Sequence, residues 1–350
     1  MATLAGDLRG GIIGRLLPGI ALSTVVAIAA VLAEPALKAL AGGKVGIPAV
    51  VIALLIGMAL HPLANVPRFE PGMTFCVKKM LRWAIALLGL RIALGDIIAL
   101  GLGTAVLVIV AMAATIASGF VLARLLGREA GMGALGGVAT AVCGASAALA
   151  TATVVKDYRN KAADVAFTVI AMNALSTVAM LVYPLICLWL GLSEQQTGVM
   201  LGATIHDVAQ VVGAGQAVSD EAANAAIIVK LFRVFLLLPA VLVVGWWLTR
   251  HGGEHGHARV PVPVFAIVFL VLCLINSVLA GMPAIAGVYA PLRDLLLEAS
   301  RWGLLIAIAA LGLGTSLGAM ARLGWRHIVL VLGTSLVILL VGTGGVLLAG

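Results

Sequence analysis

Eleven long apolar segments, joined by short connections, constrain this chain more than any other feature. A transmembrane helix needs about 20 predominantly apolar residues, so each segment is a candidate span. Hydrophobic residues make up 63% of the 350 positions and charged residues 10%, which is too much apolar surface for a soluble fold to cover. Unbroken runs also exclude a transmembrane β-barrel, whose strands alternate apolar and polar residues. The predicted segments are 16–37, 45–61, 71–91, 98–122, 133–155, 163–190, 195–216, 222–248, 260–282, 295–319 and 327–349.

The same composition excludes several function classes. The net charge of +8 indicates basic cytoplasmic loops rather than a nucleic-acid partner. The four cysteines lack CxxC spacing, so we expect neither a disulfide framework nor a zinc site. His251, His255 and His257 are interpreted as part of a solvated loop, and no metal or cofactor is predicted. Because HExxH, Walker A and intramembrane-protease motifs are missing, we predict that the protein is not an enzyme.

The sequence repeats itself. Residues 84–109 align without gaps on residues 307–332, and 13 of 26 positions are identical. A weaker pair joins GASAALAT, from Gly144, to GATIHDVAQ, from Gly202. Internal repeats, commonly of inverted topology, are typical of secondary transporters. We therefore predict one transmembrane transporter domain over 1–350, with halves 1–192 and 193–350, each containing one broken segment (133–155 and 195–216).

The distribution of basic residues indicates how these two segments lie in the membrane. If all eleven segments cross, Lys156, Arg159 and Lys161 lie outside, against the positive-inside rule. If segments 133–155 and 195–216 re-enter on the same side, the basic loops lie inside and both repeat pairs are inverted. We favour nine spans with two re-entrant segments, and eleven spans stay open. The predicted fold is an all-α polytopic membrane protein of 9–11 transmembrane segments with inverted repeats and two broken or re-entrant segments.

The first broken segment offers an anion site. Residues 133–151 are rich in Gly, Ala, Ser and Thr, which favours an interrupted helix around Cys143–Ser146. A half-helix beginning there would direct its positive end to the membrane centre, where an anion could bind. The alternative is close helix packing through small residues.

The second broken segment carries Thr204, His206, Asp207 and Gln210. A His–Asp pair inside a membrane is costly, and its chemistry suits proton coupling. The alternative is a structural polar network. A Ser146–His206 dyad is conceivable, although nothing in the sequence places the two residues together.

Lys230 and Arg233 form the third candidate. They are three residues apart and so share one helix face, and two buried cations need a negative partner. Asp207, Glu298 or a bound anion could supply the charge. The alternative is that both side chains snorkel to the interface.

These motifs together resemble the YeiH-type family of predicted sulfate exporters over about residues 45–335. The block from Thr204 to Gly215 is the most specific piece, with Asp207 where the family often has Glu. The resemblance implies a fold like that of the bile acid:sodium symporters, with inverted repeats and broken helices that cross fully at mid-membrane. By that resemblance Cys143–Ser146 and Thr204–Gln210 flank the substrate.

The expected function is secondary transport of a small anion, sulfate or a related sulfur oxyanion or sulfonate, exported across the bacterial inner membrane. H⁺ or Na⁺ is the expected coupling ion, and the bilayer and a second copy in a homodimer are the expected partners. Alternatives are an organic-anion symporter, an intramembrane hydrolase and a passive anion channel. The predicted substrate contacts are Cys143, Gly144, Ser146, Thr204, Lys230 and Arg233, and the predicted coupling residues are His206, Asp207 and Gln210.

Overall fold

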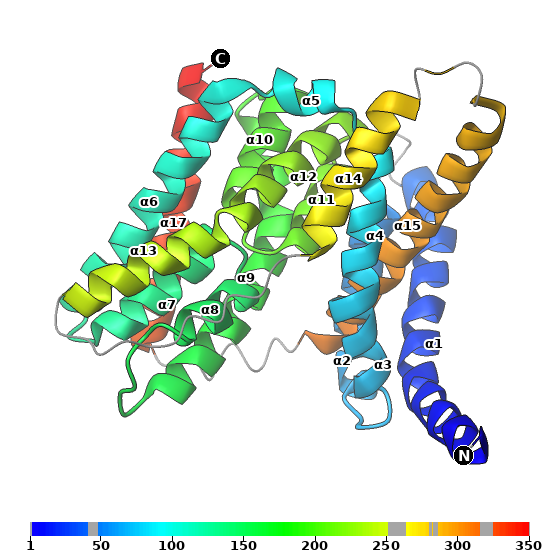
Figure 1. The fold of residues 1–350 in the computed structure, drawn as a ribbon, viewed down its shortest axis with the longest axis horizontal. Coiled ribbons are helices and arrows are strands. Elements are labelled where there is room, and N and C mark those ends of the chain that lie inside the picture. The colour runs from blue at the N-terminus through cyan, green and yellow to red at the C-terminus, as the bar shows by residue number, and fades with distance from the viewer. Residues whose placement is uncertain are drawn as a thin grey trace. The chain divides into compact units, whose positions relative to one another are not determined.

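The computed structural model describes residues 2–40, 48–250, 264–279, 282, 286–315 and 325–349, and its regular elements there are all helices (Figure 1). Except at its ends, a helix satisfies its backbone N–H and C=O groups internally, as a membrane requires. The chain divides into two compact units: residues 1–95 with 264–316, and residues 96–263 with 317–350. The predicted division at 192/193 concerns the repeat and falls inside the second unit.

The first unit packs its helices through small residues. A Cβ on Gly57 of α2 would lie 2.7 Å from the carbonyl oxygen of Ala309 in α15, so these two helices need glycine for their close approach. The span predicted at 71–91 is one run of α, π and 3₁₀ turns from α3 to η2. The elements are α1 (Ala2–Leu40), α2 (Ala49–Ala64), α3 (Glu70–Phe75), η1 (Cys76–Met80), α4 (Leu81–Leu87), η2 (Leu88–Leu90), α14 (Val264–Leu279) and α15 (Ala286–Gly314).

The second unit holds the two predicted broken segments. A short helix, α5 (Leu94–Ala99), lies at the boundary between the units. The remaining elements are α6 (Gly101–Leu125), α7 (Ala130–Ala141), α8 (Ala145–Ala152), α9 (Lys161–Trp189), α10 (Glu194–Thr204), α11 (Val208–Gln216), α12 (Asp220–Phe235), α13 (Leu237–Arg250) and α17 (Trp325–Ala349).

Within the part of the chain that the structure describes, six helical segments are long and apolar enough to cross a membrane, which confirms the all-α polytopic class. They are Gly14–Ala39, Gly101–Leu125, Lys161–Trp189, Asp220–Arg250, Gly287–Gly314 and Trp325–Leu348. The segment Asp220–Arg250 changes direction at Leu236, between α12 and α13. Pro239 causes this break, because its ring clashes with the carbonyl of Phe235 and it donates no backbone hydrogen bond.

The segment predicted at 133–155 is a hairpin that begins and ends on the same side of its unit. A Cβ on Gly131, at the start of α7, would lie 2.7 Å from the side chain of Val155, beyond the end of α8. Asp164 binds both flanks: it accepts from Arg128 at 3.2 Å and from Tyr158 at 2.8 Å. His327 of α17 donates to the same carboxylate at 2.6 Å. We call α7–α8 the first hairpin.

The segment predicted at 195–216 is a second hairpin, α10–α11. Its first helix begins with a capping box between Ser193 and Gln196. Beyond its last helix, Ser219 donates to Glu194 at 2.7 Å, so the two ends of the hairpin lie together. Ser219 also caps α12 by accepting from the amide of Ala222.

The two hairpins point in opposite directions. The helix α9 leaves the open end of the first hairpin at Asp164 and reaches the open end of the second at Ser193. At 1.5 Å per residue its 29 residues span about 43 Å, enough to cross a bilayer. Both segments are therefore hairpins, and neither continues in one direction through its break as the family resemblance implied. Their re-entry from the two sides of a membrane, which the charges favoured, stays a prediction. The sequence repeat stays a prediction, since residues 316–324 of its second copy lie outside the described residues, as do His251, His255 and His257.

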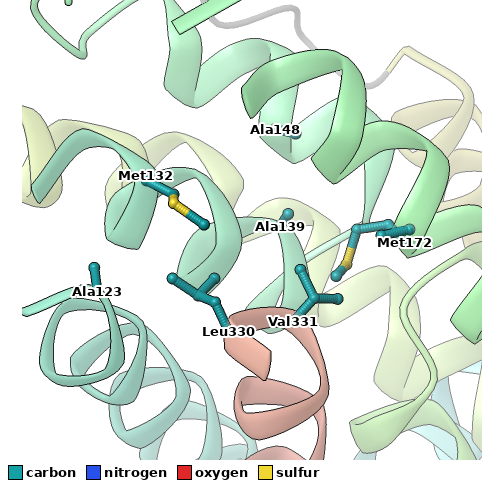
Figure 2. Packing of buried hydrophobic residues seen from close by; sticks show 8 residues of the cluster. Ala123, Met132, Ala139, Ala148, Met172, Leu330 and Val331 are labelled. Carbon is teal, nitrogen blue, oxygen red and sulfur yellow. The ribbon is translucent and has the colours of Figure 1, made fainter. Parts of the chain in front are cut away.

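An apolar cluster holds the first hairpin in its unit (Figure 2). In the figure, Leu330 and Val331 of α17 lie against Met132 and Ala139 of α7. Met172 of α9 completes the same buried cluster. Burial of a residue this size contributes about 1.5–3 kcal/mol, so the hairpin is anchored by side-chain packing as well as by its open-end hydrogen bonds.

Candidate functional site

The first hairpin breaks at its tip, between the end of α7 at Ala141 and the start of α8 at Ala145. Gly144 has φ 59° and ψ −122°, the first central position of a type II′ turn, which only glycine adopts without strain. The break leaves carbonyl groups at the end of α7 without helical partners. Ser146 lies directly after it and donates to the carbonyl of Cys143 at 3.1 Å.

The second hairpin breaks in the same way, between Thr204 and Val208. Asp207 caps α11: its side chain accepts from the amide of Ala209 at 2.9 Å. The carbonyls of Ile205 and His206 lie in the break and need donors from elsewhere. The fold thus brings two interrupted helices into the interior of one unit.

Lys230 supplies donors to both tips. Its ammonium group is fully buried and donates to the carbonyls of Val142 (2.6 Å), Ile205 (2.9 Å) and His206 (2.6 Å). An ammonium group has three N–H donors, so all of them are used. The first bond reaches the first hairpin and the other two reach the second.

Arg233 ties the same tips together one turn further along α12. It is also fully buried, and it donates to Thr140, Ala141, Gly202 and Ile205 at 2.8–2.9 Å. These four bonds use four of the five guanidinium donors. The shared face predicted for Lys230 and Arg233 is therefore observed, and the groups that receive their hydrogen bonds are backbone carbonyls at the ends of α7 and α10.

His206 links the second hairpin to the first and to α17. Its Nδ1 lies 3.3 Å from the carbonyl oxygen of Thr140, and its Nε2 lies 3.0 Å from the hydroxyl of Ser335. A carbonyl can only accept, so Nδ1 carries a proton and donates to Thr140. The hydroxyl of Ser146 instead contacts Cys143 Sγ at 2.9 Å, so neither group of the conceivable Ser146–His206 dyad is bonded to the other in this structure.

The remaining predicted residues lie around the second tip. Thr204 donates to the carbonyl of Met200 within its own helix, so its hydroxyl is not directed at the break. Gln210 donates to Thr177 of α9 at 3.5 Å. Its carbonyl oxygen and the hydroxyl of Ser176 are buried without a hydrogen-bond partner among the described residues. Such groups mark places for water or an ion.

The sequence analysis missed Thr140, Thr334 and Ser335. Thr140 and Thr334 share a buried hydroxyl contact at 2.9 Å, and Ser335 holds His206. The signal was present, because polar side chains in the middle of an apolar span usually face the interior of a membrane protein. In the sequence these hydroxyls looked no different from ones bonded within their own helix, as Thr115 is to Ala111.

These features define a class: a multi-pass membrane protein, helical throughout its described elements, with two opposed hairpins whose tips meet at a buried pair of cationic side chains. A family model described as "Conserved hypothetical protein 698" matches residues 18–331, and the chain belongs to that family. This family is the one that contains the YeiH-type and UPF0324 membrane proteins, so the resemblance described from the sequence is confirmed.

The relatives are similar over most of their length. The UPF0324 membrane protein TauZ of Paracoccus pantotrophus is 39% identical over 97% of each chain. TauZ of Paracoccus denitrificans is 41% identical over 92% of each chain. A UPF0324 membrane protein of Chlorobaculum tepidum is 39% identical over 90% of this chain and 84% of its own. No solved structure matches. The apolar helices and the membrane proteins among its relatives together identify the chain as a multi-pass protein of the bacterial inner membrane.

Proposed function

We propose that the protein is a secondary active transporter of a small anion, and that the anion binds at the meeting tips of the two hairpins. One observation carries the proposal: the cationic side chains of Lys230 and Arg233 are fully buried at the tips, where they donate to backbone carbonyls of both hairpins. Buried charge in a membrane is costly unless a counter-ion shares the site.

The N-terminus of α8 is the part of the site best suited to an anion. Its first amides have no helical partner, and Gly144 supplies no capping side chain. Ala145 and Ser146 are half-buried, whereas Cys143 and Gly144 are buried, so the start of α8 is the accessible part of this tip. The N-terminus of α11 is already capped by Asp207. An anion would therefore bind the amides at 145–146 and the Ser146 hydroxyl.

Lys230 and Arg233 act mainly as positioning residues in this proposal. Their donors hold the carbonyl ends of α7 and α10, which fixes where α8 and α11 begin. Their charge still favours an anion nearby, because electrostatic interactions are strong in a low-dielectric interior. Cys143 contributes through its contact with Ser146.

Coupling to an ion gradient is assigned to His206, Asp207 and Gln210. Protonation of Asp207 would remove the anionic cap of α11 and raise the positive charge at the tips, which strengthens anion binding. The unpartnered carbonyl oxygen of Gln210 is an alternative ligand for Na⁺. One unit would move relative to these tips to expose the anion to each side in turn.

Sulfate, or a related sulfur oxyanion or sulfonate, is the proposed substrate, moved outward. This choice, and the direction of export, follow from the family resemblance. A tetrahedral oxyanion suits a helix N-terminus with a hydroxyl, because each oxygen accepts a separate hydrogen bond.

The test is counterflow of radiolabelled sulfate in proteoliposomes, at neutral and acidic pH. We expect the wild-type protein to accumulate label against preloaded sulfate, and Ser146→Ala to slow it by about tenfold through loss of one hydroxyl bond to a charged ligand. Arg159→Gln removes an exposed cation and serves as the charge control. A folded protein without counterflow of sulfate, sulfite, sulfonates or carboxylates would contradict the carrier. Flux of label without counterflow would identify a channel.

A further inference from the structure

An apolar groove lies between α6 and α13 in the second unit, away from the hairpin tips. It has a volume of about 600 Å³, within the range of roughly 300–1,000 Å³ typical of ligand sites. Small residues, including Ala113, Ala117 and Ala240, form part of its lining, and Trp246 and Trp247 stand at one end. The helix α13 diverges from α12 at Leu236 and runs beside α6 (Figure 1).

The length of the groove matches the thickness of the hydrocarbon layer of one lipid leaflet. Its lining residues on α6 extend from Ile109 to Phe120, about 16 Å along the helix axis. The hydrocarbon core of a bilayer is about 30 Å thick, so this length is roughly half of it. Lipid acyl chains surround a membrane protein, and one acyl chain matches the groove in both length and apolar character.

One end of the groove is basic. Phe120 and Trp247 are the last lining residues of α6 and α13, and their ring centroids are 4.5 Å apart, so these ends of the two linings lie together. One turn further, Arg124 continues the groove face of α6 and Arg250 continues that of α13. Arg250 lies over Trp246 at 4.3 Å, and neither arginine has an ion-pair partner among the described residues.

We propose that this groove binds one anionic phospholipid, with an acyl chain between α6 and α13 and the phosphate between Arg124 and Arg250. Guanidinium groups bind phosphate oxygens through paired hydrogen bonds, and the tryptophans lie where aromatic belts meet headgroups. A second copy of the chain, placed symmetrically on this face, would bring two further arginines to the same end. The charges therefore favour a lipid phosphate over a self-association contact.

The test is native mass spectrometry of the full-length protein in detergent, titrated with phosphatidylglycerol or with phosphatidylcholine of identical chains. Each arginine near an anionic headgroup contributes about fivefold in affinity. We expect phosphatidylglycerol to bind tighter than phosphatidylcholine by about 30-fold. Arg124→Gln combined with Arg250→Gln should abolish that preference, and Ala117→Phe should fill the groove and weaken both lipids.

Two control variants separate the groove from general effects. Val121→Phe enlarges an exposed residue of α6 outside the groove lining, and Arg159→Gln removes an exposed cation elsewhere. Both should leave lipid binding unchanged. Equal affinity for the two lipids, or retention of the preference in the double arginine variant, would overturn the proposal. So would a change of oligomeric state in Ala117→Phe without a change in lipid binding, since the groove would then be a protein interface. Inorganic phosphate should not compete, because the acyl chain contributes to binding.

Discussion

At the scale of single residues, the account depends on two cations that serve backbone carbonyls. A helix that ends inside a membrane leaves carbonyls without donors, and such groups are costly when buried. Lys230 and Arg233 together provide seven hydrogen bonds to two such ends. They permit interrupted helices in the interior of the unit, and they leave the N-terminus of α8 available.

Arg233→Lys tests whether the stability of the tips needs the planar guanidinium group, with its fork of N–H donors, or only its positive charge. Lysine keeps the charge but has only three donors, so it cannot replace all four hydrogen bonds of Arg233. We expect the unfolding free energy in detergent to fall by about 2–4 kcal/mol, since several buried carbonyls lose donors. Arg159→Lys is the matched control at an exposed position. Unchanged stability of Arg233→Lys would show that the carbonyls do not depend on the fork.

Gly144→Ala tests the turn at the first tip. Alanine is strained at φ 59°, although a Cβ there would meet Met172 only at an ordinary 3.4 Å. Gly191, at φ 67° with open space around it, is the control, because alanine there is also forced to a positive φ but lies away from the tips. Both variants should lose about 1–2 kcal/mol of stability, and only Gly144→Ala should lose anion counterflow. Loss of counterflow in both would point to a general folding defect.

At the scale of elements, the open end of the first hairpin is fastened by Asp164 and its three donors. Tyr158 lies in the loop between α8 and α9, and burial, followed by its hydrogen bond to Asp164, raises the pKa of its phenol. The neutral phenol is thus favoured in the folded state. Its contribution to stability is complete below the unfolded pKa of about 10 and is lost as pH rises above it.

Tyr158→Phe should therefore lower the unfolding free energy by about 1–2 kcal/mol at pH 8, because Asp164 loses a donor. As pH rises above about 10, the wild-type protein should lose this advantage and the difference should shrink. Thermal unfolding of both proteins at pH 8–11 measures the difference. A gap that stays constant over this range would contradict the assigned role of the phenol.

At the scale of the whole molecule, re-entrance of both hairpins makes a topological prediction. Cysteines at exposed positions 129 and 157 flank the first hairpin and should react with an impermeant maleimide from one side. Cysteines at 195 and 218, which flank the second, should react from the other. The four native cysteines are buried and give a low background. Reaction of 129 and 157 from opposite sides would show that α7 and α8 cross.

The sequence predicts this architecture unevenly. The spans are predictable because a continuous apolar run is enough to identify each one. The spacing of Lys230 and Arg233 likewise predicts that they share one helix face. Their acceptors could not be predicted, because Val142 and Ala141 are backbone groups about 90 positions away. The loop charges at 156–161 favoured re-entrance, whereas the family resemblance implied crossing. The close approach of Gly131 to the side chain of Val155 distinguishes a hairpin from a crossing segment, and it is visible only in the three-dimensional structure.

The central claim is that the transported anion binds at the tips, and protection of residue 146 from labelling tests it most directly. Ser146→Cys, in a chain whose other cysteines are replaced and whose counterflow is retained, should react with maleimide because this position is half-buried. The account predicts that sulfate, or whichever anion shows counterflow, slows this reaction at constant ionic strength, while a cysteine at exposed position 157 reacts unchanged. Equal labelling rates at 146 with and without every transported anion would place the anion elsewhere and contradict the account.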